Sequence, residues 1–172
     1  MAKNRKQAVP KPKSDLGEVK TRFFTFADRK HPFVFRTGET LAPVTLAYET
    51  YGELNEARDN AILVFHALSG SQHAAGVNTS VTGVKRWTDE MHLGWWDGFI
   101  GPGKAMDTRK YFIICANYIG GCYGSSGPVS KNPRTGKPYG RSFPTVMLGD
   151  IVDSQVRLLD HLGIRKLHAT IG

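Results

Sequence analysis

Cysteine is scarce in this chain and long apolar runs are absent. Cys115 and Cys122 are the only two cysteines in 172 residues, too few for the disulfide framework of a small secreted protein. No run of about 18 apolar residues occurs, so the sequence predicts no membrane-spanning helix. The six histidines lack the spacings typical of metal sites, so we expect no bound metal. Low cysteine usage favours a reduced, cytoplasmic setting.

Acidic residues are also few, and the excess positive charge is unevenly spread. The net charge is +8, but residues 1–22 hold seven Lys or Arg against Asp15 and Glu18. The sequence therefore predicts a basic, disordered tail over residues 1–20 and a folded body over residues 21–172. The tail has no apolar run of the kind found in a signal peptide. The body has little excess charge and no recognition motif, which argues against the alternative of nucleic-acid binding.

The first part of the body has β character. Thr21–Phe26 and Phe33–Arg36 are short, aromatic-rich runs that predict a β-hairpin. Val44–Tyr51 predicts a further strand, in which Val44, Leu46 and Tyr48 alternate with Thr45, Ala47 and Glu49. These strands are expected at the antiparallel, amino-terminal edge of a larger sheet.

Three continuous apolar runs and one amphipathic segment follow. Ala61–Phe65, Tyr111–Asn117 and Leu167–Ile171 predict buried strands. Pro144–Leu162 predicts a helix with one apolar face, ended by Gly163. The apolar positions expected on that face are Leu148, Ile151, Val152, Gln155, Leu158, Leu159 and Leu162. This order of elements indicates an α/β fold with a mostly parallel sheet.

Glycine-rich segments follow the predicted strands, and each can be interpreted as purely structural or as functional. His66–Gly76 is either an ordinary turn or a loop whose backbone approaches a substrate closely. Trp95 and Trp96 line a pocket or, as we favour, cap the edge of a core. Gly120–Pro128 is either an anion-binding nest or, again favoured, a turn-rich connection. Surface or helix-dipole roles are expected of Asp150, Asp153, Asp160, His161 and His168.

Taken together, these segments resemble one family. The order of motifs is similar to that of homoserine O-acetyltransferase, an α/β-hydrolase-fold enzyme of methionine biosynthesis, from about Phe23 to Gly172. The motifs are Tyr48-Glu-Thr-Tyr-Gly-Glu-Leu-Asn55, His66-Ala-Leu-Ser-Gly70, Gly94-Trp-Trp-Asp-Gly-Phe-Ile-Gly-Pro-Gly-Lys104, Gly120-Gly-Cys-Tyr-Gly-Ser-Ser-Gly-Pro128, Asn132-Pro-Arg-Thr-Gly-Lys-Pro-Tyr-Gly140 and Leu159-Asp-His-Leu-Gly-Ile164. The resemblance corresponds to the amino-terminal half of that family's catalytic domain.

The resemblance implies a two-step acyl transfer. A serine takes the acetyl group from acetyl-CoA, the co-substrate, and passes it to the hydroxyl of L-homoserine, helped by a histidine and an aspartate. Leu68 matches the position whose backbone N–H completes the oxyanion hole. The strand Leu167–Ile171 and Gly172 match the start of the Gly-x-Ser-x-Gly nucleophile elbow.

The rest of the family's machinery has no counterpart in these 172 residues. The triad serine, aspartate and histidine, the homoserine-binding arginine and the helical lid would all follow Gly172. We therefore expect this chain alone to be inactive and the full-length protein to be a homodimer without a bound cofactor. Three alternatives stay open: succinyl-CoA as the acyl donor, another acyltransferase or hydrolase of the same fold, and a non-catalytic half-domain.

Overall fold

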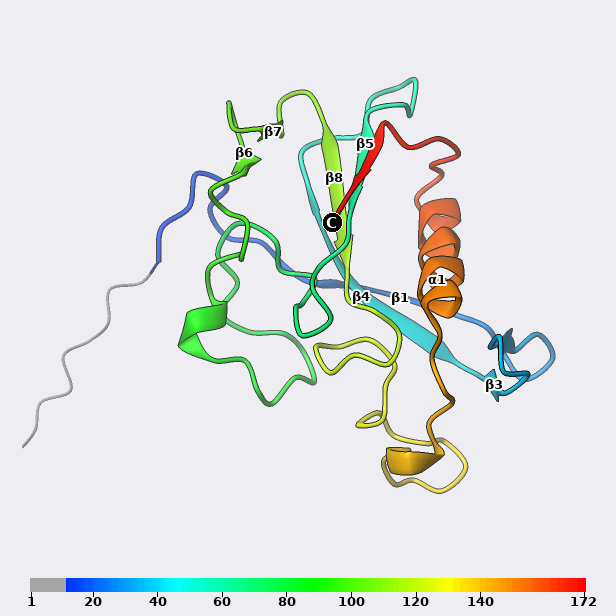
Figure 1. The fold of residues 1–172 in the computed structure, drawn as a ribbon. Helices are drawn as coiled ribbons and strands as arrows, with labels where there is room; N and C mark the ends of the chain where they lie inside the picture. The colour runs from blue at the N-terminus through cyan, green and yellow to red at the C-terminus, as the bar shows by residue number, and fades with distance from the viewer. Residues whose placement is uncertain (1–11) are drawn as a thin grey trace, which may run out of the picture.

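The computed structural model describes residues 12–172 and shows a twisted sheet flanked by one long helix and several loops (Figure 1). The five strands of the main sheet, in spatial order, are β1 (Arg22–Phe26), β4 (Val44–Tyr51), β8 (Phe112–Ala116), β5 (Ala61–Val64) and β9 (Ala169–Ile171). Two small sheets pair β2 (Phe33–Val34) with β3 (Thr40–Leu41) and β6 (Ile100–Gly101) with β7 (Met106–Asp107). The helices are α1 (Leu148–His161) and the single 3₁₀ turns η1 (Asp89–Met91) and η2 (Gly140–Ser142).

The main sheet is mixed, and its antiparallel part is the amino-terminal edge, as predicted. β1 pairs antiparallel with β4, and β4 pairs antiparallel with β8. β5 lies between β8 and β9 and is parallel to both, so two of the four pairings are parallel. The carboxyl ends of β5, β8 and β9 therefore meet at one end of the sheet, where ligands bind in open α/β sheets.

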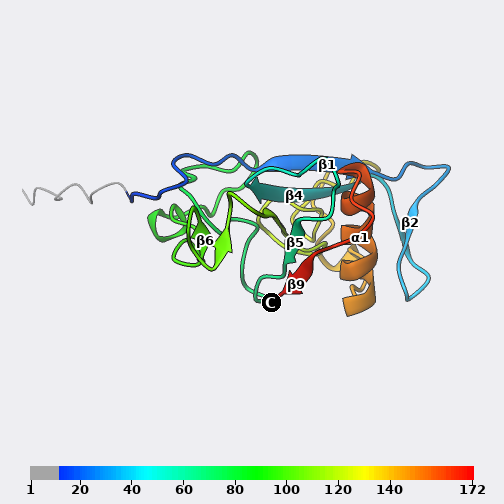
Figure 2. The same ribbon diagram turned by 90° about the horizontal axis from the view of Figure 1, so that it is seen from above.

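Alternate residues of the central strands divide the core into two layers. In β8, Phe112, Ile114 and Ala116 join a cluster that includes Leu158 and Leu159 of α1. Ile113 and Cys115 face the other way, into a second cluster with Ile100, Met106, Ala74 and Ala75. Figure 2 shows α1 on one side of the sheet and the segment that carries β6 on the other. Coverage of both faces explains why these strands are continuous apolar runs.

Helix α1 starts four residues later than the predicted Pro144. Its start is fixed by Asp150, whose carboxylate accepts the Met147 N–H at 2.7 Å and the Arg36 N–H at 2.8 Å. Gly163 ends the helix with φ +71°, a conformation that favours glycine. The predicted apolar face is only partly buried, because Leu148 and Val152 are 75% and 49% exposed.

The predicted hairpin between Thr21–Phe26 and Phe33–Arg36 is wrong. β1 pairs instead with β4 in the register Phe24 opposite Leu46, and β2 pairs locally with β3. The longer register with β4 lets the Phe24 ring pack against the first core cluster and stack on His161 of α1, with ring centroids 4.3 Å apart. The free energy gained by burying aromatic surface thus exceeds the loop-closure entropy that the shorter hairpin loop would save.

The predicted tail is too long at its carboxyl end. Residues 1–11 lie outside the described residues, but residues 14–20 are ordered against the glycine-rich segment. The Val19 N–H donates to the Val77 carbonyl at 2.9 Å, and Ser14 hydrogen-bonds to Asp97. The side chains of Leu16 and Val19 pack on the second core cluster. The basic composition of this stretch gave no indication that Leu16 and Val19 would pack on the core.

No helix in the part of the chain from residue 12 onward is both long enough and apolar enough to cross a bilayer.

Candidate functional site

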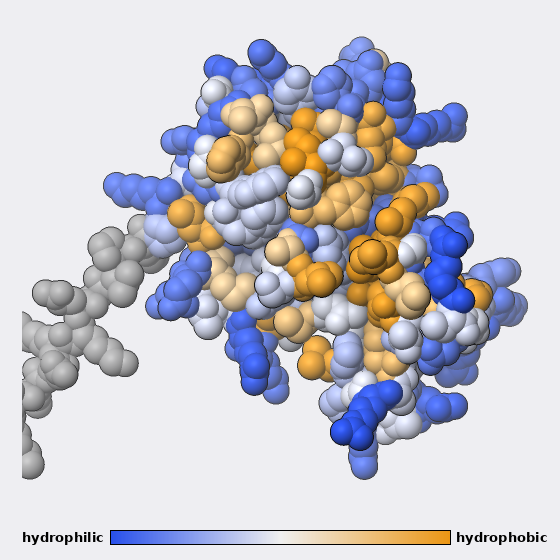
Figure 3. All heavy atoms as spheres, in the orientation of Figure 1, coloured by the Kyte–Doolittle hydropathy of each residue, from blue (hydrophilic) through white to orange (hydrophobic). Residues whose placement is uncertain are grey.

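A cavity of about 690 Å³ lies at the carboxyl ends of the parallel strands. Figure 3 shows hydrophobic residues gathered over the middle of the face seen in Figure 1, with hydrophilic residues around its rim. Phe65 follows β5 and Gly172 follows β9, and the Phe65 N–H donates to the Ile171 carbonyl at 2.8 Å. Loop residues supply the remaining walls; the full lining is Phe65, His66, Ala67, Ser69, Gly70, Ser71, His73, Glu90, Met91, Leu93, Trp95, Trp96, Tyr123 and Gly172.

The loop of residues 66–70 separates this cavity from a second one of about 760 Å³. The Gly70 N–H donates to the Ala67 carbonyl at 2.7 Å and closes a tight turn. Leu68 lies at the tip of the turn, is 84% exposed and lines only the second cavity. Among residues 12–172, nothing accepts a hydrogen bond from the Leu68 N–H. A free backbone donor beside a cavity is what an oxyanion hole requires, but the role of Leu68 stays a prediction.

His66 holds the start of this loop in place. Its Nδ1 donates to the Ala67 carbonyl at 2.6 Å, and the Tyr118 hydroxyl donates to the His66 carbonyl. The two rings stack with centroids 3.8 Å apart. Burial lowers the pKa of His66 and raises the pKa of Tyr118 to about 12, so the imidazole is neutral and the phenol stays a donor near pH 7.

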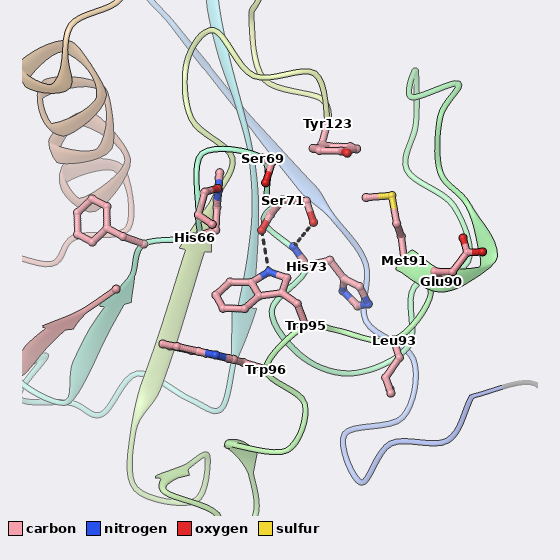
Figure 4. A pocket seen from close by; sticks show the side chains of 14 residues that line it. His66, Ser69, Ser71, His73, Glu90, Met91, Leu93, Trp95, Trp96 and Tyr123 are labelled. Atoms are coloured by element: carbon pink, nitrogen blue, oxygen red, sulfur yellow. Dashed lines mark hydrogen bonds between the residues drawn. The ribbon is translucent and has the colours of Figure 1, made fainter.

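The tandem tryptophans fulfil both roles considered for them. Trp95 is 39% exposed and lines the first cavity, and its indole Nε1 donates to the Ser71 carbonyl at 3.0 Å. Trp96 also lines the cavity but packs its ring on the second core cluster. Figure 4 shows the two indoles on one side of the cavity and Tyr123 on the other. The favoured interpretation, capping of a core edge, is thus incomplete.

A buried polar cluster lies behind the wall of the first cavity. The carboxylate of Glu49 on β4 is fully buried and contacts the ring of His73 at 2.8 Å. Tyr51, Thr21 and Asn78 also hydrogen-bond to this carboxylate. The sequence pattern did not predict this cluster. The available signal was a single carboxylate inside the predicted strand Val44–Tyr51.

The glycine loop of residues 120–128 is a turn-rich connection, as favoured. Its two serines are occupied by structural hydrogen bonds. Ser125 Oγ accepts the Ala47 N–H at 2.9 Å and donates to the Asn117 carbonyl at 2.6 Å, and Ser126 Oγ accepts the Thr45 N–H at 2.9 Å. This loop therefore completes the hydrogen bonding of β4.

The acidic and histidine side chains on and around α1 are outside both cavities. Asp150 is buried and accepts two backbone N–H groups, and Asp153 pairs with Arg36 at 2.7 Å. His161 stacks on Phe24, and His168 lies against Tyr111. Within residues 12–172, no three His, Cys, Asp or Glu side chains gather as a metal site would require.

Sequence comparisons match nearly the whole chain to homoserine acyltransferases. The homoserine O-acetyltransferase of Deferribacter desulfuricans is 53% identical over 159 residues, which are 92% of this chain and 39% of that protein. A homoserine O-succinyltransferase from an Azoarcus species is 54% identical over 141 residues, 82% of this chain and 36% of that protein. The chain thus spans about two-fifths of the length of the curated relatives it matches. No family model matches it.

Solved structures agree in fold. The homoserine O-acetyltransferase of Bacillus anthracis has a TM-score of 0.73 at 39% identity, over 88% of this chain and 39% of that one. Esterase E22 has a TM-score of 0.75 at 39% identity, over 90% of this chain and 40% of that one. These matches confirm the α/β-hydrolase fold and the resemblance to homoserine O-acetyltransferases.

Proposed function

We propose that this chain is the amino-terminal part of a homoserine O-acetyltransferase, which transfers an acetyl group from acetyl-CoA to the hydroxyl of L-homoserine. The observation that supports the proposal most strongly is that two segments, the loop after β5 and the residue after β9, lie at the same cavity. In an α/β-hydrolase these two positions supply the oxyanion hole and the nucleophile elbow. Identity of 53% to a homoserine O-acetyltransferase supports the substrate assignment.

In this proposal the backbone N–H of Leu68 stabilises the oxyanion that forms when the serine attacks acetyl-CoA. The tight Ala67–Gly70 turn and the anchoring of His66 hold that amide in place without using its N–H. Such fixed donors stabilise charge that develops in the transition state. The serine, aspartate and histidine of the triad come from the part of the protein that follows Gly172.

The wider assignments belong to the same proposal. The full-length protein acts in methionine biosynthesis as a homodimer, with no bound cofactor besides the acetyl-CoA it consumes. It works in the cytoplasm, where Cys115 and Cys122 stay reduced.

Two other acyl-transfer activities have specific support. The 54% identity to a homoserine O-succinyltransferase makes succinyl-CoA the competing donor. The likeness to esterase E22 makes water the competing acceptor. All three reactions would use the same oxyanion hole and differ in what the cavities admit.

The test is a thiol-release assay on the full-length protein. Acetyl-CoA and succinyl-CoA are each supplied with L-homoserine, with L-serine or with water alone as acceptor. Homoserine-dependent release from acetyl-CoA supports the proposal, and preferential use of succinyl-CoA replaces the donor. Thiol release with water alone that L-homoserine does not increase would indicate a hydrolase instead.

A further inference from the structure

The carboxylate of Glu49 is fully buried and accepts hydrogen bonds on both oxygens. Thr21 Oγ1 and Asn78 Nδ2 donate to Oε1 at 2.7 and 2.8 Å. Tyr51 OH and His73 Nδ1 approach Oε2 at 2.9 and 2.8 Å. Partners that can all donate satisfy an ionised carboxylate, and such a group is costly to bury without them.

His73 connects the Glu49 carboxylate to the segment that forms the cavity wall. Its ring is 1% exposed, and while Nδ1 faces Glu49, Nε2 faces the His92 carbonyl at 3.1 Å. Both ring nitrogens are thus held, one by the Glu49 carboxylate and the other by the His92 carbonyl. His73 therefore links β4 to the segment of residues 89–96. This segment supplies five lining residues of the first cavity: Glu90, Met91, Leu93, Trp95 and Trp96.

Tyr51 forms a second link from the same carboxylate. Its hydroxyl donates to Glu49 and accepts the N–H groups of Ala74 and Ala75 at 2.8 and 3.1 Å. Burial first, and then the charge of Glu49, raises the pKa of Tyr51 well above its ordinary value, so the hydroxyl keeps its proton. One carboxylate thereby fixes, through Tyr51, the backbone that directly follows His73.

The two linked segments are joined to each other next to the cavity. The Trp96 N–H donates to the Ala74 carbonyl at 2.7 Å, and the Trp95 N–H donates to the His73 carbonyl at 3.3 Å. The Trp95 indole donates in turn to the Ser71 carbonyl. Hydrogen bonds thus connect Glu49, through His73, to Trp95, although Glu49 itself touches neither cavity.

We infer that Glu49 and His73 are positioning residues of this site. Through paired hydrogen bonds they set the cavity wall formed by residues 71–76 and 92–96, and with it the ring of Trp95. The inference rests on the proposed function for its kinetic consequence, because a displaced wall misplaces the acyl-transfer partners. A misplacement of about 1 Å can cost about 100-fold in rate.

The test compares Glu49→Gln and His73→Gln with wild type in the full-length protein. The first readout is the Trp95 indole N–H resonance in ¹⁵N-tryptophan-labelled protein, assigned with Trp95→Phe. The second is kcat/KM for acyl transfer at equal folded fraction. Both variants should shift the indole resonance and lower kcat/KM by about 10- to 100-fold. The double variant should lose about as much as either single one, because paired residues act as a unit.

The matched control is Asp150→Asn, which alters an equally buried carboxylate that caps α1 on the opposite side of the sheet. It should lower stability but leave the indole resonance and kcat/KM near wild type. The inference is overturned if Glu49→Gln leaves both readouts unchanged, or if Asp150→Asn lowers kcat/KM as much.

If Glu49→Gln does not fold, Tyr51→Phe replaces it as the test variant. It removes one hydroxyl and should displace the same resonance, and an unchanged resonance would count against the inference. A wild-type protein without acyl transfer would defeat the proposed function, while the indole resonance would still decide the positioning role.

Discussion

Gly94 lies so close to Ala75 that a Cβ on it would come within 2.2 Å of the Ala75 Cα and backbone nitrogen. Backbone atoms cannot move aside as the end of a side chain can. This contact presses the tryptophan segment against the loop that contains His73, and it requires glycine for lack of space rather than for an unusual φ.

Gly94→Ala should therefore destabilise the fold by about 3 kcal/mol, as overpacking of a tight contact does. Gly98→Ala is the matched control, because nothing lies within 4 Å of a Cβ there. It should be neutral or should stabilise by up to about 1 kcal/mol. Urea unfolding followed by tryptophan fluorescence measures both, and equal stability of the two variants would contradict the contact.

Asp97 should make stability depend on acid pH. Burial opposes its ionisation, but hydrogen bonds from Ser14 and the Gly76 N–H, together with Lys104, outweigh burial and hold the pKa below its ordinary value. A lowered pKa stabilises the fold above the unfolded value of about 3.9 and loses that contribution as pH falls through the folded pKa.

Asp97→Asn should thus be less stable than wild type at neutral pH, and the difference should shrink as the pH falls below about 4. Asp15→Asn is the control, since Asp15 faces the same lysine at 3.4 Å but is 70% exposed. It should change stability little at any pH. A stability gap for Asp97→Asn that is constant with pH would refute the assigned cause.

The two cysteines should differ sharply in reactivity. Cys122 is exposed, whereas Cys115 is fully buried in β8, where burial strongly raises the pKa of its thiol. A thiol reagent should label Cys122 in the native protein and reach Cys115 only on unfolding. Cys122→Ser should then show no native labelling. Rapid labelling of that variant would mean that β8 is not covered as described.

Leu68 should matter through its amide and not through its side chain. In the full-length protein, Leu68→Ala should keep kcat close to wild type, because the side chain is 84% exposed. Leu68→Pro removes the N–H and should lower kcat by about two to three orders of magnitude. Circular dichroism checks that the proline variant is folded. Equal kcat for the two folded variants would take the oxyanion role away from Leu68.

The 172-residue chain alone should release no CoA from acetyl-CoA, with or without L-homoserine. It carries the proposed oxyanion donor, but the proposed triad residues lie outside it. The full-length protein assayed beside it is the positive control. Homoserine-dependent CoA release by the chain alone would show that a nucleophile among these residues has been overlooked.

Periodicity predicted the strands and the helix well because it reports burial. It also predicted that Thr45, Ala47 and Glu49 share a face of their strand. It did not predict that this face is covered: Ala47 and Glu49 are fully buried. The 71–78 loop and Thr21 cover Glu49, and the glycine loop of residues 120–128 covers Ala47. The placement of these covering segments depends on contacts between residues distant in sequence.

The same limit explains the wrong hairpin and the overlong tail. Local turn signals favoured pairing Thr21–Phe26 with its neighbour, while the actual partner, β4, is set by aromatic packing against α1. Leu16 and Val19 are two apolar residues in a basic stretch, too few to outweigh its composition. His73 was visible only as one of six histidines, since its partner on β4 lies 24 residues away.

Substitutions in β8 should have different effects at even-numbered and odd-numbered positions, because the two sets of side chains face opposite sides of the sheet. Even-numbered positions, from Phe112 to Ala116, pack in the layer that holds α1, so substitutions there change the packing of the helix on the sheet. Odd-numbered positions, Ile113 and Cys115, touch the layer that holds Ala74 and Ala75. A methyl group gained or lost at Ile113 or Cys115 therefore changes packing against the segment that supports the cavity wall. Only one face of β8 can affect the site in this way.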